Sequence, residues 1–358
     1  MKKQVAVWGT GNVGRPAIRA VLAHRDLDLA AVIVSNPEKV GRDAGELAGV
    51  EPCGVLATAD WQALLQGRKL DAIVYVANAD TRGADAFMEL LACLEAGVNV
   101  VSTAFYPLLF PDCGMMEAIE PVRAACERGS SSVFVSGIDP GWAMDILPIL
   151  ASGVVADIEE IRVQEIFNYS LYDQPEVVRE VIGFGGSMDI LPLMLEDYSL
   201  KMVWAPMLHI MATALELSLD SVEIHVERRA LERPIEVPGM GVFEKGTQGA
   251  FRFEVCGILN GETRLAVEHV TRIDDECASD WPYPPQGRGC HQVLIKGSPD
   301  LTISVHGHDS IEPGPAGGGN GSAANRVVNA IPAVCAAEEG ILTPLDLPPI
   351  NGAAQMRL

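Results

Sequence analysis

The sequence predicts an α/β fold, with a doubly wound parallel sheet in the first part and a second domain of α+β character after it. Two observations predict this fold. From Gln4 to Val135, short segments that are apolar throughout alternate with helical patterns, and strands covered on both faces have this composition. After Gly141 the alternation ends, and a long helical region precedes several extended segments. Strict alternation of strand and helix implies parallel pairing, so we place the parallel sheet in the first part.

The length of 358 residues is enough for two domains. We expect a first domain over residues 1–140, a second over 141–315, and a C-terminal helix and tail over 323–358 that return to the first. Residues 312–322, EPGPAGGGNGS, predict a loop or linker because glycine and proline dominate them.

The net charge of −22 argues against binding to nucleic acid or anionic lipid, which requires clustered Lys and Arg. A small molecule is therefore the expected partner. The eight cysteines show no CxxC spacing, which favours reduced thiols over a metal site. The N-terminus lacks the apolar core of a signal peptide, and Met202 to Leu215 is too short to span a bilayer. We expect a soluble, cytoplasmic protein.

In the first domain, six apolar segments predict strands, over residues 4–8, 29–34, 54–58, 71–77, 99–103 and 132–136. Helical patterns run from Arg15 to His24 and from Gly83 to Ala96. In the second domain a helical region is expected around Met188 to Leu217, followed by extended segments over 222–228, 250–258, 263–273 and 292–295. Asn260 and Gly261 predict a tight hairpin, because both tolerate positive φ, so this half should form an antiparallel sheet with helices. The last helix is expected over Ala323 to Ala337, with a buried stripe of Val327, Val328, Ile331 and Val334.

The most specific motif is G-x-G-x-x-G at Gly9, Gly11 and Gly14, directly after a predicted strand and before a predicted helix. The first glycine makes a turn, the second lets backbone amides approach a pyrophosphate, and the third allows close helix packing. The helix N-terminus favours the anion. We therefore expect dinucleotide binding by this loop, including Thr10, Asn12 and Val13.

The residues after the second strand bear on which dinucleotide binds. NAD enzymes place an Asp or Glu there for the ribose 2′-hydroxyl, whereas this chain reads VSNPEKVGR. Ser35 and Asn36 can donate hydrogen bonds, and Lys39 and Arg42 carry positive charge, so NADP(H) is favoured over NAD(H). Glu38 could still face the adenosine, and Lys39 and Arg42 could belong to an ordinary solvated loop.

Residues at the carboxyl ends of other strands should flank the same cofactor, namely Ala77, Asn78 and Thr103. Asp139 has two readings. It can cap a helix that starts at Pro140 and runs to about Leu150, or it can hold the nicotinamide carboxamide.

Five segments together resemble one family: NPEKVGRDAGEL, SGIDPGWAMDILP, WPYPPQGRG, the C-terminal NRVVNAIPAVCAAEEGILTPLDLP and the glycine loop. They resemble the dihydrodipicolinate reductase-like group that includes 2,4-diaminopentanoate dehydrogenase and native amine dehydrogenases. The resemblance implies a Rossmann domain, a central substrate and dimerisation domain, and homodimers. It also implies NAD(P)-dependent interconversion of a carbonyl and an amine. No His and Lys cluster for a dicarboxylate is found in the second domain, which disfavours dihydrodipicolinate reductase itself.

The segment VSTAFYPLLFP departs from that family. The resemblance implies a glutamate that serves the amine chemistry where this chain has Phe105. A carboxylate there would hold ammonium and stabilise the iminium, and its loss costs about 3 to 5 kcal/mol of barrier unless another residue replaces it. Tyr106 is the adjacent candidate proton donor, although it can equally pack under Pro107.

Weaker candidates for the proton donor are Tyr169, Tyr172 and His209. Pocket candidates are Phe105, Trp142, Tyr172 and His209, with Met188 as a further plausible pocket wall. His209 and the apolar candidates could instead be ordinary core residues. We expect an NADP-dependent oxidoreductase that transfers hydride to a carbonyl or imine carbon of a small, largely apolar substrate. Phe105 favours a ketone or preformed-imine reductase. The alternatives are a true amine dehydrogenase with a relocated acid and an NADPH-sensing protein without turnover.

Overall fold

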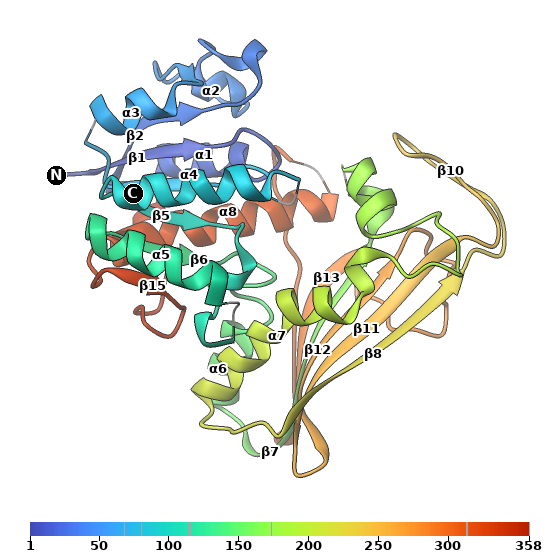
Figure 1. Cartoon of the computed structure of the whole chain (residues 1–358). Coiled ribbons are helices and arrows are strands. Elements are labelled where there is room, and N and C mark those ends of the chain that lie inside the picture. Colours follow the sequence, from blue (N-terminus) through green and yellow to red (C-terminus); the bar gives the residue numbers. More distant parts are fainter. Residues whose placement is uncertain (68, 80, 114–115, 173, 313, 358) are drawn as a thin grey trace. The chain divides into compact units, whose positions relative to one another are not determined.

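Figure 1 shows the computed structural model, which describes residues 1–357 apart from 68, 80, 114, 115, 173 and 313. The chain divides into two compact units. The first consists of Met1–Gly141 together with Gly319–Leu358, and the second is the segment Trp142–Gly318 inserted between them. Among the described residues, no helix combines the length and the apolar character needed to cross a bilayer.

The first unit is built on a seven-stranded parallel sheet in the order β15-β6-β5-β4-β1-β2-β3. Its strands are β1 (Lys3–Trp8), β2 (Leu27–Ile33), β3 (Ala57–Thr58), β4 (Ala72–Tyr75), β5 (Asn99–Ser102), β6 (Ser132–Val135) and β15 (Gly340–Leu342). The first six lie on the six predicted segments, so the parallel, doubly wound fold is confirmed. The sequence does not predict β15, because its three residues are too few to form a pattern.

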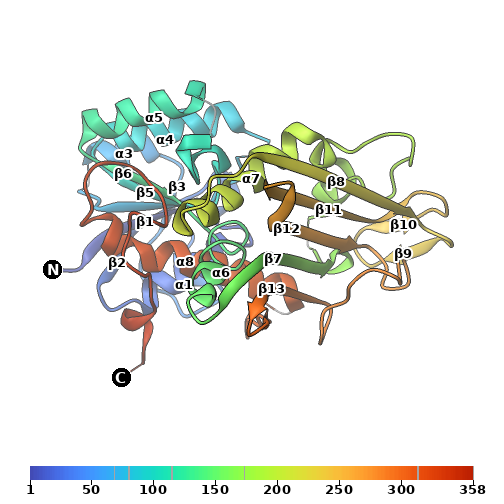
Figure 2. The same cartoon turned by 90° about the horizontal axis from the view of Figure 1, so that it is seen from below.

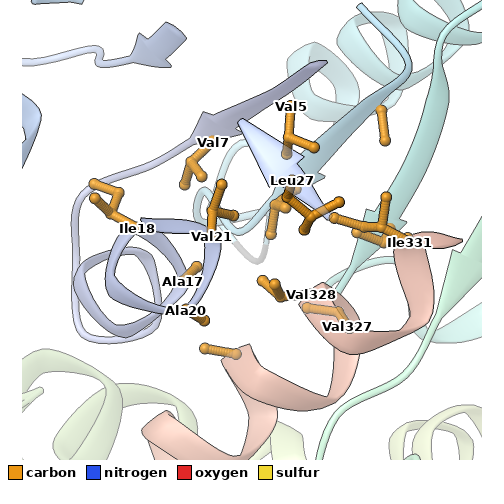
Figure 3. Packing of buried hydrophobic residues seen from close by; sticks show 14 of the residues in the cluster. Val5, Val7, Ala17, Ile18, Ala20, Val21, Leu27, Val327, Val328 and Ile331 are labelled. Atoms are coloured by element: carbon orange, nitrogen blue, oxygen red, sulfur yellow. The ribbon is translucent and has the colours of Figure 1, made fainter. Parts of the chain in front are cut away.

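Helices cover both faces of this sheet. They are α1 (Gly14–Ala23), α2 (Ala44–Leu47), α3 (Trp61–Gly67), α4 (Gly83–Glu95), α5 (Met116–Gly129) and α8 (Gly314–Val334), the last from Gly319 onward. Val5 and Val7 point to the face of α1 and α8, where Val21, Val328 and Ile331 are fully buried against them (Figure 3). Ala6 and Trp8 point to the other face, toward α4 and α5. Burial of each large apolar side chain stabilises the fold by about 1.5 to 3 kcal/mol.

The second unit contains a six-stranded mixed sheet in the order β14-β13-β7-β12-β11-β8. Figure 2 shows β13, β7, β12, β11 and β8 side by side in this order. Its strands are β7 (Ala156–Asn168), β8 (Ser221–Ala230), β11 (Gln248–Leu259), β12 (Glu262–Arg272), β13 (Gly289–Ser298) and β14 (Leu301–Val305), and β9 (Ile235–Val237) pairs with β10 (Gly241–Phe243) separately. The hairpin at Asn260 and Gly261 is confirmed, with φ of 55° and 77°.

The expectation of a wholly antiparallel sheet is wrong at one pair, since β7 and β12 run parallel. The sequence pattern misses β7 because charged side chains alternate with apolar ones along it, so it is not a continuous apolar segment. Its length of 13 residues makes it the longest strand described, and it pairs with both β12 and β13. β7 therefore organises this unit.

Within the described part of the chain, α6 (Ile146–Ser152) contacts β7 and β13, and α7 (Asp197–Ala214) contacts β8, β11 and β12. The helical region predicted from Met188 begins only at Asp197. The helix begins later than predicted because Pro192 has no amide hydrogen for a helical bond. A 3-10 turn at Leu193–Leu195 follows this proline and precedes the helix.

The prediction of a loop over residues 312–322 is wrong, because α8 begins at Gly314; Pro313 lies outside the described residues. The glycines there permit close backbone approach. A Cβ on Gly317 would lie 1.9 Å from the carbonyl oxygen of Glu312, and one on Gly318 would lie 2.3 Å from that of Gly307. A composition typical of linkers therefore serves tight packing of a helix.

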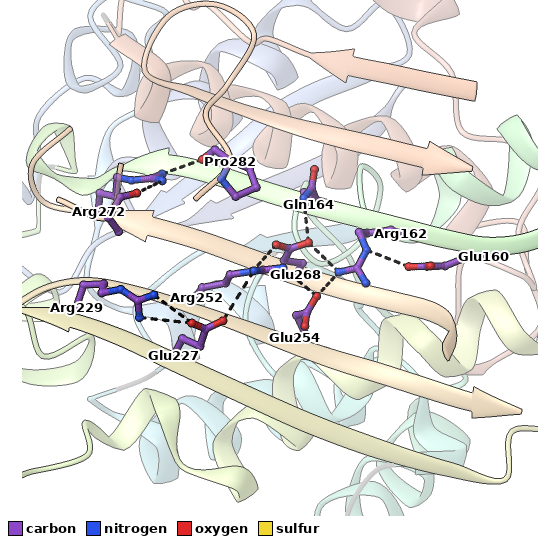
Figure 4. A network of polar contacts seen from close by, with 11 residues as sticks. Glu160, Arg162, Gln164, Glu227, Arg229, Arg252, Glu254, Glu268, Arg272 and Pro282 are labelled. Atoms are coloured by element: carbon purple, nitrogen blue, oxygen red, sulfur yellow. Dashed lines mark hydrogen bonds and ion pairs between the residues drawn. The ribbon is translucent and has the colours of Figure 1, made fainter. Parts of the chain in front are cut away.

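Polar side chains on one face of the second unit's sheet form an ion-pair network (Figure 4). At its centre Glu268 is only 1% exposed, and its carboxylate accepts hydrogen bonds from Arg162 Nη1 at 2.9 Å and Arg252 Nε at 2.7 Å. Gln164 Nε2 donates to the same group at 2.9 Å. Two guanidinium groups thus compensate the negative charge of one buried carboxylate. Each guanidinium would lose a hydrogen-bond partner if the carboxylate were removed.

We predict that Glu268→Gln lowers the free energy of unfolding by about 1 to 3 kcal/mol, because Arg162 and Arg252 each lose a charged hydrogen-bond partner while keeping Glu254. The matched control is Glu160→Gln, since Glu160 contacts Arg162 from a position where its side chain is 29% exposed. This control should change the free energy by less than about 1 kcal/mol. Urea unfolding followed by tryptophan fluorescence measures both, and equal effects would contradict the prediction.

Candidate active site

The glycine loop of the first unit runs from the end of β1 to the start of α1, and packing explains two of its glycines. Gly9 has φ of 115°, and a Cβ there would lie 2.9 Å from the carbonyl oxygen of Val76. A Cβ on Gly14 would lie 2.2 Å from the carbonyl oxygen of Gly9. Gly11 differs, because no described heavy atom lies within 4 Å of its Cβ position. The loop is therefore closed against the sheet and open at Gly11, where a pyrophosphate would approach the backbone.

The N-terminus of α1 supplies the charge that such a ligand requires. Within the first turn the amides of Arg15 and Ala17 bond to the carbonyls of Gly11 and Val13, and Pro16 lacks an amide hydrogen. The helix dipole places partial positive charge at this end. Thr10, Asn12 and Val13 lie in the loop, with Thr10 nearly buried and the other two half-buried. The backbone here fits the pyrophosphate of a dinucleotide.

The loop after β2 meets the glycine loop through Lys39. Its Nζ donates hydrogen bonds to Thr10 Oγ1 at 3.0 Å and to the Thr10 carbonyl at 3.3 Å. Asn36 Oδ1 accepts a bond from the amide of Glu38 and starts the 3-10 turn Pro37–Lys39. Ser35, Asn36 and Arg42 are exposed. The structure therefore brings one predicted cation to the loop.

The carboxyl ends of β1, β4 and β5 are neighbours in the sheet, so the residues after them share one edge. The Cβ position of Gly9 is 3.0 Å from the amide nitrogen of Ala77. Asn78 Oδ1 accepts a bond from the amide of Thr81 at 3.2 Å. Thr103 follows β5, and its Cγ2 lies 4.0 Å from the Cβ position of Gly137. Ala77 and Thr103 thus stand where ligands bind in open α/β sheets.

Phe105 forms an aromatic wall at this edge. Its backbone is left-handed, with φ of 65°, which is unusual for a bulky residue and is typical of functional segments. Its ring lies 5.2 Å from that of Tyr75, which in turn lies 5.3 Å from Trp8. Tyr106 begins the 3-10 turn Tyr106–Leu108 and is half-buried. The loop after β5 thus presents a phenyl ring at position 105, and a catalytic role for Tyr106 stays a prediction.

The predicted helix cap at Asp139 is wrong. α6 begins at Ile146, and Asp145 caps it by accepting a bond from the Ile146 amide at 2.6 Å. The chain cannot start a helix at Pro140 because Gly141 has φ of 125°, outside the helical region. A Cβ on Gly141 would also lie 2.1 Å from the amide nitrogen of Gly137, so this segment is a tight turn. The cofactor reading of Asp139 stays a prediction.

The second unit holds a buried acid–imidazole centre that the sequence interpretation missed. Glu165 on β7 pairs with His269 on β12 and with His291 on β13. Glu165 Oε1 lies 3.6 Å from His269 Nδ1, and Oε2 lies 3.6 Å from His291 Nε2. The hydroxyl of Tyr169 donates to Oε1 at 3.0 Å. The three titratable side chains are at most 12% exposed. The available signal was the alternation along β7, but the partners of β7 could not be inferred from it.

Aromatic rings surround this centre. Phe253 stacks on His269 at 4.6 Å, Trp204 of α7 meets the same imidazole edge-on at 5.0 Å, and Phe167 lies 5.3 Å from His291. Tyr172, a predicted pocket residue, lies 5.1 Å from Tyr169. The structure therefore brings Tyr172 and Tyr169 to the centre.

The remaining predicted pocket residues are His209, Trp142 and Met188, and the contacts described for them belong to the fold itself. His209 is half-buried on α7, and burial lowers its pKa, so the neutral form is favoured at pH 7. The carbonyl of Trp142 accepts a bond from the amide of Leu147 at 2.8 Å, and that of Met188 accepts one from Arg228 at 3.0 Å. Their side-chain roles stay predictions.

A doubly wound parallel sheet with this glycine loop defines a dinucleotide-binding domain of the Rossmann type. Residues 3–105 match the family "Dihydrodipicolinate reductase, N-terminus", and residues 142–357 match "2,4-diaminopentanoate dehydrogenase C-terminal domain". The chain belongs to the 2,4-diaminopentanoate dehydrogenase and amine dehydrogenase family, as its sequence motifs indicate, and is an NAD(P)-dependent oxidoreductase.

Two relatives and one solved structure illustrate the match. The chain is 48% identical to an amine dehydrogenase of Streptomyces virginiae over 96% of this chain and 95% of the relative. It is 21% identical to 2,4-diaminopentanoate dehydrogenase of Acetoanaerobium sticklandii over 97% and 94%. An amine dehydrogenase structure from Mycobacterium smegmatis covers 99% of both chains with a TM-score of 0.75 and 19% identity, which shows the shared fold.

We predict that Gly11→Ala weakens dinucleotide affinity by about tenfold or more and leaves the melting temperature unchanged, because its Cβ enters the open space that the pyrophosphate needs. Gly14→Ala should instead destabilise the fold by about 1 to 3 kcal/mol, because its Cβ collides with backbone. Gly83→Ala, with no atom near its Cβ position, is the control and should change neither quantity. Cofactor titration and thermal unfolding separate the effects, and wild-type affinity in Gly11→Ala would refute the loop assignment.

Proposed function

We propose that this protein is an amine dehydrogenase that interconverts a small amine and its carbonyl compound by hydride transfer. The observation that carries the proposal is a glycine loop with the geometry of a pyrophosphate site, in a chain 48% identical to an amine dehydrogenase over nearly its whole length. The bound nicotinamide supplies or accepts the hydride at the substrate carbon. Water and ammonium are the other participants.

Aromatic side chains support a largely apolar substrate. Phe105 presents a phenyl ring in the first unit, and the half-buried Tyr169 and Tyr172 lie 5.1 Å apart in the second. Such surfaces exclude water, which protects an iminium from hydrolysis and strengthens electrostatic interactions with it. A small ketone, or the amine formed from it, suits this composition.

A second candidate is reduction of a ketone or of a preformed imine. Phe105 favours it, because a phenyl ring cannot hold ammonium by charge or exchange a proton with it. Reduction of a ketone needs only one proton donor for the alkoxide, and Tyr106 follows Phe105 directly. The two candidates differ in whether nitrogen enters the product.

Product analysis distinguishes the two candidates. Wild-type enzyme with reduced nicotinamide and a panel of linear and cyclic ketones should yield amine, and only when ammonium is present. Phe105→Leu should retain most of this activity, because the proposal assigns Phe105 an apolar surface and no proton transfer. Cofactor oxidation that is equally fast without ammonium, with alcohol as the product, would instead identify a ketone reductase.

We also propose a preference for NADP(H). In its support, the strand β2 is followed by Ser35 and Asn36 instead of a carboxylate, and Lys39 lies at the glycine loop while Arg42 is exposed nearby in the sequence. A ribose 2′-phosphate would gain charge-assisted hydrogen bonds from such cations.

Lys39→Ala and Arg42→Ala should each lower kcat/KM for NADPH by about tenfold, as expected for loss of a hydrogen bond to a charged group. The values for NADH should change little. Lys69→Ala removes one exposed charge outside the loop after β2 and serves as the control. Equal losses with both cofactors, or a wild-type preference for NADH, would contradict the proposed preference.

A homodimer and a cytoplasmic location, both expected from the sequence, remain proposals. All eight cysteines are free thiols, which supports a reducing compartment.

A further inference from the structure

We propose that Glu165 is the carboxylate that binds ammonium and transfers its protons in reductive amination, the role that the loop after β5 cannot perform with Phe105. This inference rests on the proposed function and assigns its acid–base chemistry to the second unit. Amination needs a group that attracts a cation, takes up one proton and later returns it. Glu165 lies on the central strand β7, and its position, its neighbours and its aromatic surroundings meet these requirements.

Its position is fixed by strand register. Glu165 is the direct cross-strand neighbour of His269 on one side and of His291 on the other. Each imidazole lies 3.6 Å from a different carboxylate oxygen, and the Tyr169 hydroxyl donates to Oε1 at 3.0 Å. These contacts orient the carboxylate and leave its charge on a side chain that is 12% exposed. A catalytic carboxylate needs this kind of fixed, mostly dry setting.

Comparison with Glu268 distinguishes a carboxylate that serves as a permanent ion-pair partner from one that can take up and release a proton. The contacts of Glu268 include two guanidinium groups, which remain protonated at all physiological pH values and hold the carboxylate as a permanent ion pair. The contacts of Glu165 include a phenol and two imidazoles, and neither kind of group carries a permanent positive charge. Glu165 thus has neighbours that tolerate a change in its protonation state.

The surroundings suit a small cation. Phe253, Trp204 and Phe167 place ring systems around the two imidazoles, and an aromatic surface attracts ammonium through its π electrons. On the same face of β12, the hydroxyl of Thr271 is fully buried, and no hydrogen-bond partner for it is found among the described residues. A buried hydroxyl of this kind is usually satisfied by a ligand or water.

The chemistry balances as follows. The Glu165 carboxylate takes one proton from ammonium, and the freed nitrogen lone pair bonds to the carbonyl carbon while a proton moves from nitrogen to oxygen. The Glu165 carboxylic acid then returns its proton to the carbinolamine hydroxyl, the C–O bond breaks, water leaves, and an iminium forms beside the restored carboxylate. Hydride from the reduced nicotinamide completes the amine. One ketone, one ammonium and one reduced cofactor give one amine, one water and one oxidised cofactor.

The test compares two reactions of the full-length enzyme. In Glu165→Gln, kcat/KM for amine formation from cyclohexanone and ammonium should fall by about 100-fold or more, as expected for loss of an acid–base group. Reduction of a preformed imine, 2-methyl-1-pyrroline, should fall by about tenfold at most, because it needs neither ammonium nor loss of water and loses only the carboxylate beside the iminium. Glu160→Gln makes the same substitution on the same strand, five positions from Glu165 and on the opposite face, and should change neither reaction.

The outcomes separate the two proposals. If wild type forms amine and Glu165→Gln forms it equally fast, or if both reactions fall by the same factor, the Glu165 inference is wrong and the proposed function stands. If wild type forms no amine from any ketone with ammonium, the proposed function itself fails. Should Glu165→Gln not fold, Glu165→Asp keeps the carboxylate one methylene shorter. It should lower amination by about tenfold and imine reduction by less, and unchanged amination would overturn the inference.

Discussion

The parallel pairing of β7 with β12 is the constraint on which the second unit depends. It sets Gln164 opposite Glu268 and Glu165 opposite His269 in one register. Because successive side chains of a strand point to opposite faces, this one pairing builds the Glu268 ion-pair network on one face and the acid–imidazole centre on the other. A shift of one residue would exchange the faces and destroy both. The Asn260–Gly261 hairpin supports the register by fixing β11 against β12.

In the first unit, the local sequence is sufficient to predict most of the secondary structure. Its strands are buried on both faces, so each is a short apolar segment, and the glycine loop is a contiguous motif. These features could be predicted because each depends on residues near in sequence. The same is true of the hairpin at Asn260. The shared edge of β1, β4 and β5 then follows from the general rules of doubly wound sheets.

What sequence interpretation missed depends on residues distant in the chain. Glu165 and His269 are more than a hundred positions apart, and β7 carries charges that disguise it as a solvated segment. The glycines at 317 and 318 predict a flexible loop by composition, yet they are needed where a helix approaches backbone closely. Asp139 precedes a proline like a helix cap, but Gly141 redirects the chain first. In each case a tertiary contact overrides the local preference.

The first unit is discontinuous in sequence, and this has a consequence for folding during synthesis. Val5 and Val7 lie against Val328 and Ile331, and β6 gains β15 as its outer neighbour only from the last part of the chain. The ribosome therefore releases the whole second unit before the first can be completed. Until then one face of the early sheet exposes apolar side chains. Such a nascent chain is a natural client for chaperones, and premature termination would yield an aggregation-prone fragment.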